Sequence, residues 1–519
     1  MPKQKTDDLL TLINSLSRAE KRHFRLFVKR NQSSEDILFL QLFDFLERKG
    51  EYEEDLILKR LPDIKKAQLS NLKAHLYRQL LTSLRLLAVR NSEEMSVREM
   101  LDCSRVLYDK GLYRQALDLL DKARNRARSS ALHGLALEIL EFEKHIEGQF
   151  ITRSIEGRAD ELAQETMELM GILRDNHDFS NLSLQLYGLY LKIGFVRNTR
   201  DYDMVRAFFQ SKLPTAPYPA LDLISRIHHD QAYVWFHFMT QDFPYCYKYA
   251  TRWVETLEEN PELIQQRGIL YIKGLHNLLT ALFNLGHNEK YTEALEKLLA
   301  LPGIYPLERD RNLEGNFFLF KYNHLIRKHF LDGSFSEGLR LVPEVMELIE
   351  TDRYNWDNHR TMLFYYSIAC LYFGAGDNRN AITYLNFILN ERSPDYRTDI
   401  QVYARILNLI AHYEIGNAQL VEYQVKSVFR FLAKLEELGA VHLEIFRFLR
   451  KLPRMQVSDV RREFQSLKHR LEKLELDPFE KRPFLYLDII SWLDSKISGR
   501  SVQEVIQAKA QDRLKLFSH

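Results

Sequence analysis

The segment SRVLYDKGLYRQALDLLDKA, residues 104–123, contains the pattern that decides the fold. Gly111 stands between two amphipathic stretches, Tyr113 follows it, and Ala116 comes three residues later. A glycine supplies the left-handed backbone that a tight turn after a helix needs. A small side chain at position 116 lets the second helix approach the first closely. This order predicts a hairpin of two antiparallel helices.

The same order recurs with its turns at Gln241, Gly286, Gly333, Gly376 and Gly416. These turns are separated by 45, 47, 43 and 40 residues. The 130 residues between positions 111 and 241 hold three such spacings, so we expect two further turns, near residues 155–157 and 197–201. Self-similarity at a fixed period indicates stacked repeats. We therefore expect about eight helical hairpins over residues 95–440.

These units resemble the tetratricopeptide repeat, in which a turn glycine and an aromatic residue are followed by a small residue where two helices cross. The usual period of that family is about 34 residues, so the longer spacing here requires longer helices or linkers. The resemblance implies an all-α, elongated α-solenoid whose first helices line a concave groove for a peptide or helix. The two ends of the chain also resemble those of uncharacterised helical-repeat proteins of Bacteroidota, a resemblance that implies no activity.

The use of proline and glycine agrees with a helical chain. The 519 residues include 14 prolines and 20 glycines, and the 151 residues between Pro62 and Pro214 contain no proline. Proline costs about 3 kcal/mol and glycine about 1 kcal/mol inside a helix. All-β folds need many Gly and Pro turns, so this composition argues against them.

The regions outside the repeats form two further predicted parts. In residues 1–94, Ser17 and Glu20 have the spacing of a helix capping box, and helices are expected over residues 36–49, 53–61 and 66–90. Residues 441–519 contain a charged helix, 457–476, and an apolar segment around Trp492. We expect a helical N-terminal domain at 1–94, the solenoid at 95–440 and a C-terminal helical cap at 441–519, because an array needs an end unit to cover its last apolar face.

The resemblance also indicates groove residues. Positions that line the groove in tetratricopeptide proteins correspond here to Arg105, Gln231, Trp235, Lys273, His276, Asn323, Arg327 and Tyr366. Aromatic side chains and arginine dominate many binding hot spots. The leading hypothesis is therefore a scaffold or adaptor that binds a partner helix or peptide.

The charge distribution leaves a second function open. Residues 1–90 carry a net charge of +6 and residues 441–519 a net charge of +5, so the body between them carries −9. Residues 54–78 are typical of a helix, a turn and a second helix, and the second helix carries Lys66, Gln68, Asn71, Lys73, His75 and Arg78. Such groups can contact phosphates and base edges. A transcription- or RNA-related regulator is the alternative, although a purely structural helical cap gives the same pattern.

Motifs for catalysis are absent from the sequence. There is no phosphate-binding glycine loop, no G-x-S-x-G and no H-E-x-x-H. His228, His229 and His237 form the densest histidine group, but no cysteine or acidic residue completes a metal site at helical spacing. The three widely spaced cysteines, expected to be small buried residues, are Cys103, Cys246 and Cys370. With no signal peptide and no apolar run of about 18 residues, we expect a cytoplasmic, non-enzymatic protein without metal, cofactor or membrane span.

Overall fold

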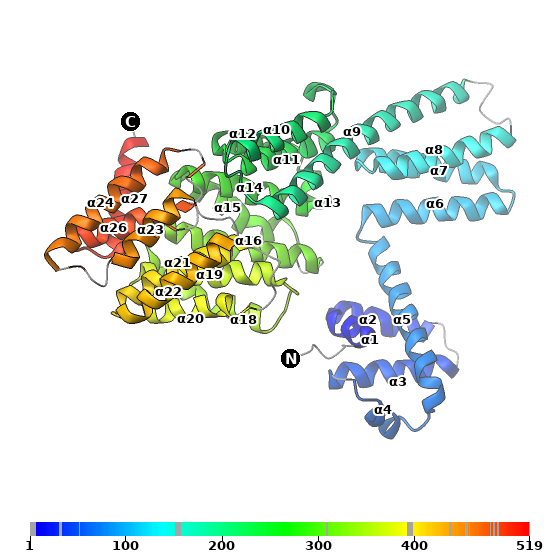
Figure 1. The fold of residues 1–519 in the computed structure, drawn as a ribbon. Coiled ribbons are helices and arrows are strands. Elements are labelled where there is room, and N and C mark those ends of the chain that lie inside the picture. The colour runs from blue at the N-terminus through cyan, green and yellow to red at the C-terminus, as the bar shows by residue number, and fades with distance from the viewer. Residues whose placement is uncertain are drawn as a thin grey trace. The chain divides into compact units, whose positions relative to one another are not determined.

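The computed structural model describes residues 7–30, 34–50, 52–150, 157–307, 310–391, 398–434, 439–451, 455, 457–477, 479–480, 483–484 and 487–517. Within these ranges the chain is built from helices and contains no strand (Figure 1). The all-helical class predicted from the shortage of proline and glycine is therefore confirmed.

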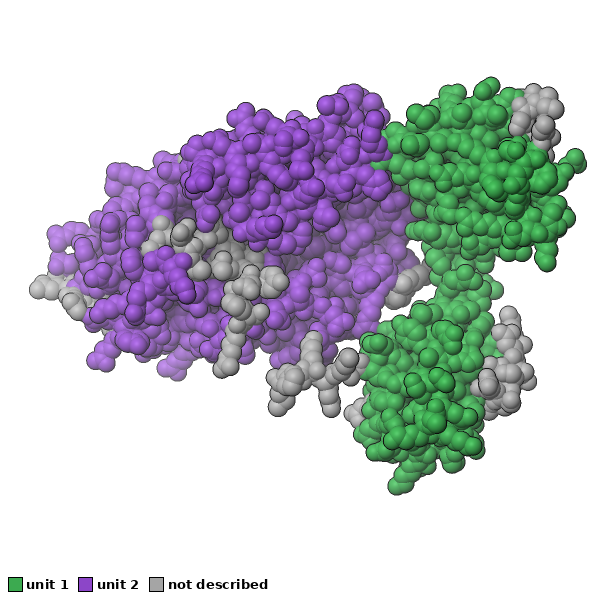
Figure 2. All heavy atoms as spheres, turned by 45° about the vertical axis from the view of Figure 1, so that its right-hand side comes forward, with its two compact units in different colours: residues 1–173 green, residues 174–519 purple. Residues whose placement is uncertain are grey.

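The chain divides into two compact units, residues 1–173 and 174–519 (Figure 2). The division falls inside α9, Arg158–Ile193. The limits expected from the sequence, after residues 94 and 440, fall in the first turns of α6, Glu93–Asp109, and α23, Ala440–Lys451.

The first unit begins with a bundle of five helices, α1 Asp8–Ser15, α2 Arg18–Arg30, α3 Ser34–Lys49, α4 Glu54–Arg60 and α5 Lys66–Val89. Its core contains the fully buried Phe24, Phe43 and Leu76. The predicted capping box is confirmed, because the Ser17 amide donates to Glu20 Oε2 at 2.7 Å and the Glu20 amide donates to Ser17 Oγ at 3.2 Å.

The predicted hairpin around Gly111 is formed by α6 and α7, Tyr113–Ser129, with α8, His133–Gln149, packed beside α7 (Figure 1). Gly111 has a φ of +76° and Ala116 is fully buried. The start of α9 is tied to this group of helices by the buried carboxylate of Glu143. It accepts two hydrogen bonds from Arg158, at 2.9 and 3.0 Å, and one from Arg124 at 3.0 Å.

The region between residues 125 and 200 departs from the expected repeat spacing. The turn between α7 and α8 is at Ala131, with a φ of +51°, where no turn was expected. The turn expected near 155–157 lies almost wholly outside the described residues. The helix α9 then runs for 36 residues without a break and ends before Gly194, while residues 199–201 already belong to α10, Thr199–Lys212. The turn expected near 197–201 was therefore placed a few residues too late.

Residues 213–434 of the second unit continue as paired helices. They are α11 Leu223–Met239, α12 Phe243–Glu258, α13 Pro261–Gln266, α14 Gly268–Leu285, α15 Asn288–Ile304, α16 Arg311–Asp332, α17 Phe335–Gly338, α18 Val342–Glu350, α19 Asn358–Gly374, α20 Asn378–Leu389, α21 Thr398–Glu414 and α22 Ala418–Lys434. The five predicted turn positions all have left-handed backbone, with φ between +59° at Gln241 and +85° at Gly376. The expected turns are confirmed here, including the one that lacks glycine.

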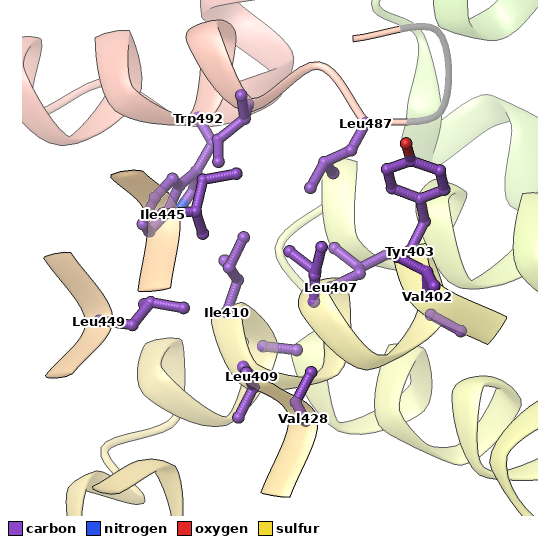
Figure 3. Close-up of a cluster of buried hydrophobic side chains, with 14 of the residues drawn as sticks. Val402, Tyr403, Leu407, Leu409, Ile410, Val428, Ile445, Leu449, Leu487 and Trp492 are labelled. Carbon is purple, nitrogen blue, oxygen red and sulfur yellow. The ribbon is translucent and has the colours of Figure 1, made fainter. Parts of the chain in front are cut away.

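The C-terminal helices extend the core of α21 and α22. They are α23, α24 Val457–Glu475, α26 Ile489–Ser498 and α27 Val502–Phe517. Trp492 of α26 is buried in the same cluster as Ile410, Val428 and Ile445 (Figure 3). Its indole N–H donates to Glu414 Oε1 at 2.7 Å. The apolar segment around Trp492 thus covers an apolar face of the neighbouring helices, as the sequence predicts.

The last helix, α27, packs against the turn between α16 and α17. The Oε1 of Gln503 in α27 accepts hydrogen bonds from the amide and hydroxyl of Ser336, both at 3.0 Å. Gly333, with a φ of +68°, makes this approach possible, because a Cβ there would lie 2.7 Å from the backbone nitrogen of Gln507. Ile506 is buried against the core beneath this turn.

Gly333→Ala should therefore destabilise the protein more than Gly376→Ala. Both positions are left-handed, so each alanine costs about 1–2 kcal/mol of backbone strain. Only at position 333 does the new methyl group also collide with a packed helix, which adds about 1–3 kcal/mol, since a Cβ at 376 meets nothing within 4 Å. Urea unfolding and hydrogen exchange of α27 measure the difference. Equal losses of stability for the two variants would contradict the close approach.

Candidate functional site

The helices α14 and α16 bring His276 and Arg327, two of the predicted groove residues, to one place. His276 Nδ1 lies 2.8 Å from His324 Nε2, and His324 Nδ1 lies 3.0 Å from the hydroxyl oxygen of Tyr291 in α15. The Tyr291 hydroxyl donates its proton to the backbone carbonyl of His324 at 2.9 Å. The Tyr291 hydroxyl oxygen therefore accepts a hydrogen bond from Nδ1–H of His324. Nε2 of His324 then carries no proton and accepts a hydrogen bond from Nδ1–H of His276.

This network is neutral at physiological pH. Burial and the nearby charge of Arg327 lower the pKa of His276 to about 3, and burial beside His276 lowers the pKa of His324 well below its usual value. The His276 ring also stacks on Phe320, with ring centres 4.0 Å apart. The two histidines therefore stay uncharged near pH 7 and join α14 to α16 through their hydrogen bond.

Polar and cationic groups lie on the same two helices. The Arg327 guanidinium donates to the Thr280 hydroxyl at 3.1 Å and lies 5.2 Å from the centre of the Phe283 ring. Lys273 is one turn before His276 on α14 and is exposed, although partial desolvation by neighbouring groups and the charge of Arg360 lower its pKa. Asn323 Oδ1 is buried and meets no donor among the described residues. These groups make up the α14–α16 surface.

Trp235 belongs to a second surface, on α9 and α11. Its ring lies 5.0 Å from that of Tyr187 and 5.6 Å from that of Tyr190. Leu184 and Leu191, three residues before and four residues after Tyr187 on α9, are 67% and 52% exposed. We call Leu184, Tyr187, Leu191 and Trp235 the α9–α11 face. The residues on α9 were missed in the sequence, although their helical spacing of 3 and 4 was visible there.

The remaining predicted groove residues lie elsewhere. Gln231 is half-buried and contacts His228 Nδ1 at 3.3 Å. Arg105, in the first unit, is exposed and forms an ion pair with Glu138 at 2.7 Å. Tyr366 is buried in the core around α19 and α21, so its ring is not presented to a partner. The predicted groove residues on α11, α14 and α16 are Gln231, Trp235, Lys273, His276, Asn323 and Arg327, and their role in binding stays a prediction.

The N-terminal candidates for nucleic-acid contact divide into two groups. Lys66 is 76% exposed, 3.5 Å from Glu54, and Gln68, Asn71 and Arg78 are also exposed. Lys73 instead donates to Asp7, and its ammonium lies 4.0 Å from the centre of the Tyr52 ring. His75 packs on Phe39 with ring centres 5.2 Å apart. The first four remain accessible, whereas Lys73 and His75 join parts of the bundle.

The three cysteines differ in their burial. Burial raises the pKa of Cys246, and burial raises the pKa of Cys370 to about 12, so neither favours the thiolate. Cys103 is exposed, which corrects its predicted burial. It faces solvent because it lies on the side of α6 opposite the packed Val97 and Leu101. Among the described residues, no cluster of three or more His, Cys, Asp or Glu has the arrangement of a metal site.

No described helix combines the length and the apolar character needed to cross a membrane. No protein-family model, curated protein or solved structure matches this chain.

Acidification should weaken the second unit through the His276–His324 pair. Both histidines are neutral in the fold but take up protons in the unfolded chain below about pH 6.5. Stability contributed by the neutral pair is complete above that pH and declines as the pH falls toward 3, by about 1 kcal/mol per pH unit for each histidine. Urea unfolding between pH 7.5 and 5 measures the slope.

His276→Gln tests the assignment, because glutamine does not titrate. Its unfolding free energy should depend less steeply on pH than that of the wild type, even though the variant is less stable at pH 7.5. His469→Gln, at an exposed position, serves as the matched control and should keep the wild-type slope. An unchanged slope in His276→Gln would show that other groups cause the acid sensitivity.

Lys73→Met should lower the free energy of unfolding of the N-terminal bundle by about 1–2 kcal/mol, because it removes a charge-assisted hydrogen bond to Asp7. Lys66→Met removes only an exposed pair and should change it by less than 0.5 kcal/mol, on the usual scale for such pairs. Thermal unfolding of the two variants measures the contrast. If Lys73→Met leaves the free energy of unfolding unchanged, Lys73 would again count among the residues that are free to bind a ligand.

Proposed function

We propose that this protein is a non-catalytic scaffold or adaptor, an α-solenoid of tetratricopeptide-like hairpins that holds a helix or peptide of a partner protein. Support comes from the paired helices, from the left-handed turns at 40–47-residue spacing and from the surfaces on the first helices of the hairpins. The partner would bind where aromatic and cationic side chains remain accessible between neighbouring hairpins.

The α9–α11 face is the observation that carries this proposal. Two highly exposed leucines flank an aromatic pair, Tyr187 and Trp235, whose rings are fixed by mutual contact. Tryptophan, tyrosine and arginine are enriched among binding hot spots. An amphipathic helix, which presents apolar anchors at positions i, i+3 or i+4, and i+7, suits such a face.

The α14–α16 surface supplies the polar part of the proposed recognition. Lys273 is exposed and offers a donor, and Arg327 is fixed by Thr280 and Phe283. Side chains held in place before binding lose less entropy when a partner docks. The neutral histidine pair beneath Arg327 stabilises this arrangement without adding charge.

The double variant Leu184→Glu/Leu191→Glu should lose its main partners in affinity purification followed by mass spectrometry, because it places two charges on the α9–α11 face. Purified binding to each identified partner should weaken at least about tenfold, as expected for loss of two apolar anchors. Leu476→Glu, at another strongly exposed leucine, is the matched control. Retention of every partner by the double variant would contradict binding at this face.

One observation supports the alternative hypothesis of a transcription- or RNA-related regulator. Four polar side chains on the N-terminal half of α5 are exposed: Lys66, Gln68, Asn71 and Arg78. If these residues contact nucleic acid, Lys66→Gln/Arg78→Gln should weaken DNA or RNA binding and reduce its dependence on salt. Unchanged binding by this variant would exclude the α5 surface as the contact.

A further inference from the structure

The outer side of α22 and α23 carries a second basic surface. Tyr423, Lys426 and Arg430 are spaced by 3 and 4 residues on α22, and all three are exposed, Tyr423 to 77%. They lie opposite the buried face of α22, which contains Val421, Val425, Val428 and Leu432. This helical spacing puts one aromatic ring and two cations on one exposed face.

The seam between the two helices adds a second ring and a third cation. Phe429 of α22 is 40% exposed, and its ring centre lies 6.1 Å from that of Phe446 in α23. Arg450 follows Phe446 by one helical turn and is exposed, while Lys426 precedes Phe429 by three residues. Lys426 and Arg450 therefore flank the seam. We call Tyr423, Lys426, Phe429, Arg430 and Arg450 the α22–α23 basic face.

The three cations of this face have no acidic partner in the described part of the chain. Among the described residues, the Arg430 side chain donates a 3.4 Å hydrogen bond to the carbonyl of Lys426 in its own helix and forms no ion pair. The carboxylate of Glu444 on α23 accepts hydrogen bonds from Arg447 and Arg470, each at 2.6 Å. Glu422 on α22 also has an interaction partner. The positive charge of the face is therefore available to a ligand.

We propose that the α22–α23 basic face binds single-stranded nucleic acid. Lys426, Arg430 and Arg450 neutralise backbone phosphates, and the exposed rings of Tyr423 and Phe429 stack on bases. Proteins that bind single strands combine these two elements, a basic surface that follows the backbone and aromatic rings that accept any base. An acidic protein partner would supply negative charge to the cations but no series of flat bases for the two rings. This site is separate from the α9–α11 face, so its failure leaves the proposed partner binding unaffected.

The test uses the full-length protein and fluorescein-labelled 12-mers of dT and rU, followed by fluorescence anisotropy between 50 and 200 mM salt. Lys426→Gln/Arg430→Gln/Arg450→Gln should bind at least about tenfold more weakly at the lower salt concentration. Its log–log salt slope should be smaller by about 2, because each phosphate contact on a single strand contributes about 0.7. Tyr423→Leu should bind at least about fivefold more weakly, whereas Tyr423→Phe, which keeps the ring, should bind like the wild type.

A matched triple variant, Lys110→Gln/Arg114→Gln/Lys122→Gln, removes three exposed cations from the first unit and gives the same change in net charge. It should keep wild-type binding. The proposal is overturned if the wild type does not bind the 12-mers at micromolar concentration, or if the matched variant weakens binding as much as the α22–α23 variant. It is also overturned if only Lys66→Gln/Arg78→Gln abolishes binding, or if poly-glutamate or phosphatidylserine vesicles bind through this face while the 12-mers do not.

Discussion

The left-handed residue at each hairpin turn is the constraint on which the rest of the structure depends. At Gly111, Gln241, Gly286, Gly333 and Gly376 the chain reverses within a few residues, and the next helix begins almost at once. The reversal places consecutive helices side by side, where a small buried residue such as Ala116 or Ala381 lets them approach. The packing of the two helices that each turn joins, and the faces that remain exposed, follow from these turns.

The sequence predicted the turns well because left-handed backbone has a chemical signature. Glycine reveals such a position, and Gln241 was found because its neighbours repeat the order seen elsewhere. Ala131 was missed, since an alanine with a φ of +51° resembles any helical alanine in the sequence. The length of α9 was missed for a related reason. Repeat spacing implied an interruption, but its 36 residues contain no proline and tolerate two glycines.

The candidate site was predictable only in part, because it depends on contacts between helices far apart in the sequence. Of the groove positions transferred from a 34-residue repeat, Trp235 is partly accessible, whereas Tyr366 is buried in the core. His276 was predicted as a groove residue, whereas its contact with His324, 48 residues away, has no local signal. The exposed leucines of α9 also look like ordinary core residues until the structure shows which side of the helix is covered.

The docking of α27 on the α16–α17 turn has a consequence for biosynthesis. Gln503 and Ser336 are 167 residues apart, so a ribosome that adds about 5–20 residues per second needs roughly 10–30 s to supply the second partner after the first. Throughout that interval the apolar surface later covered by Ile506 stays open on the nascent chain. Completion of this unit therefore waits for the synthesis of α27, and during that interval a chaperone could bind and shield the exposed α16–α17 region.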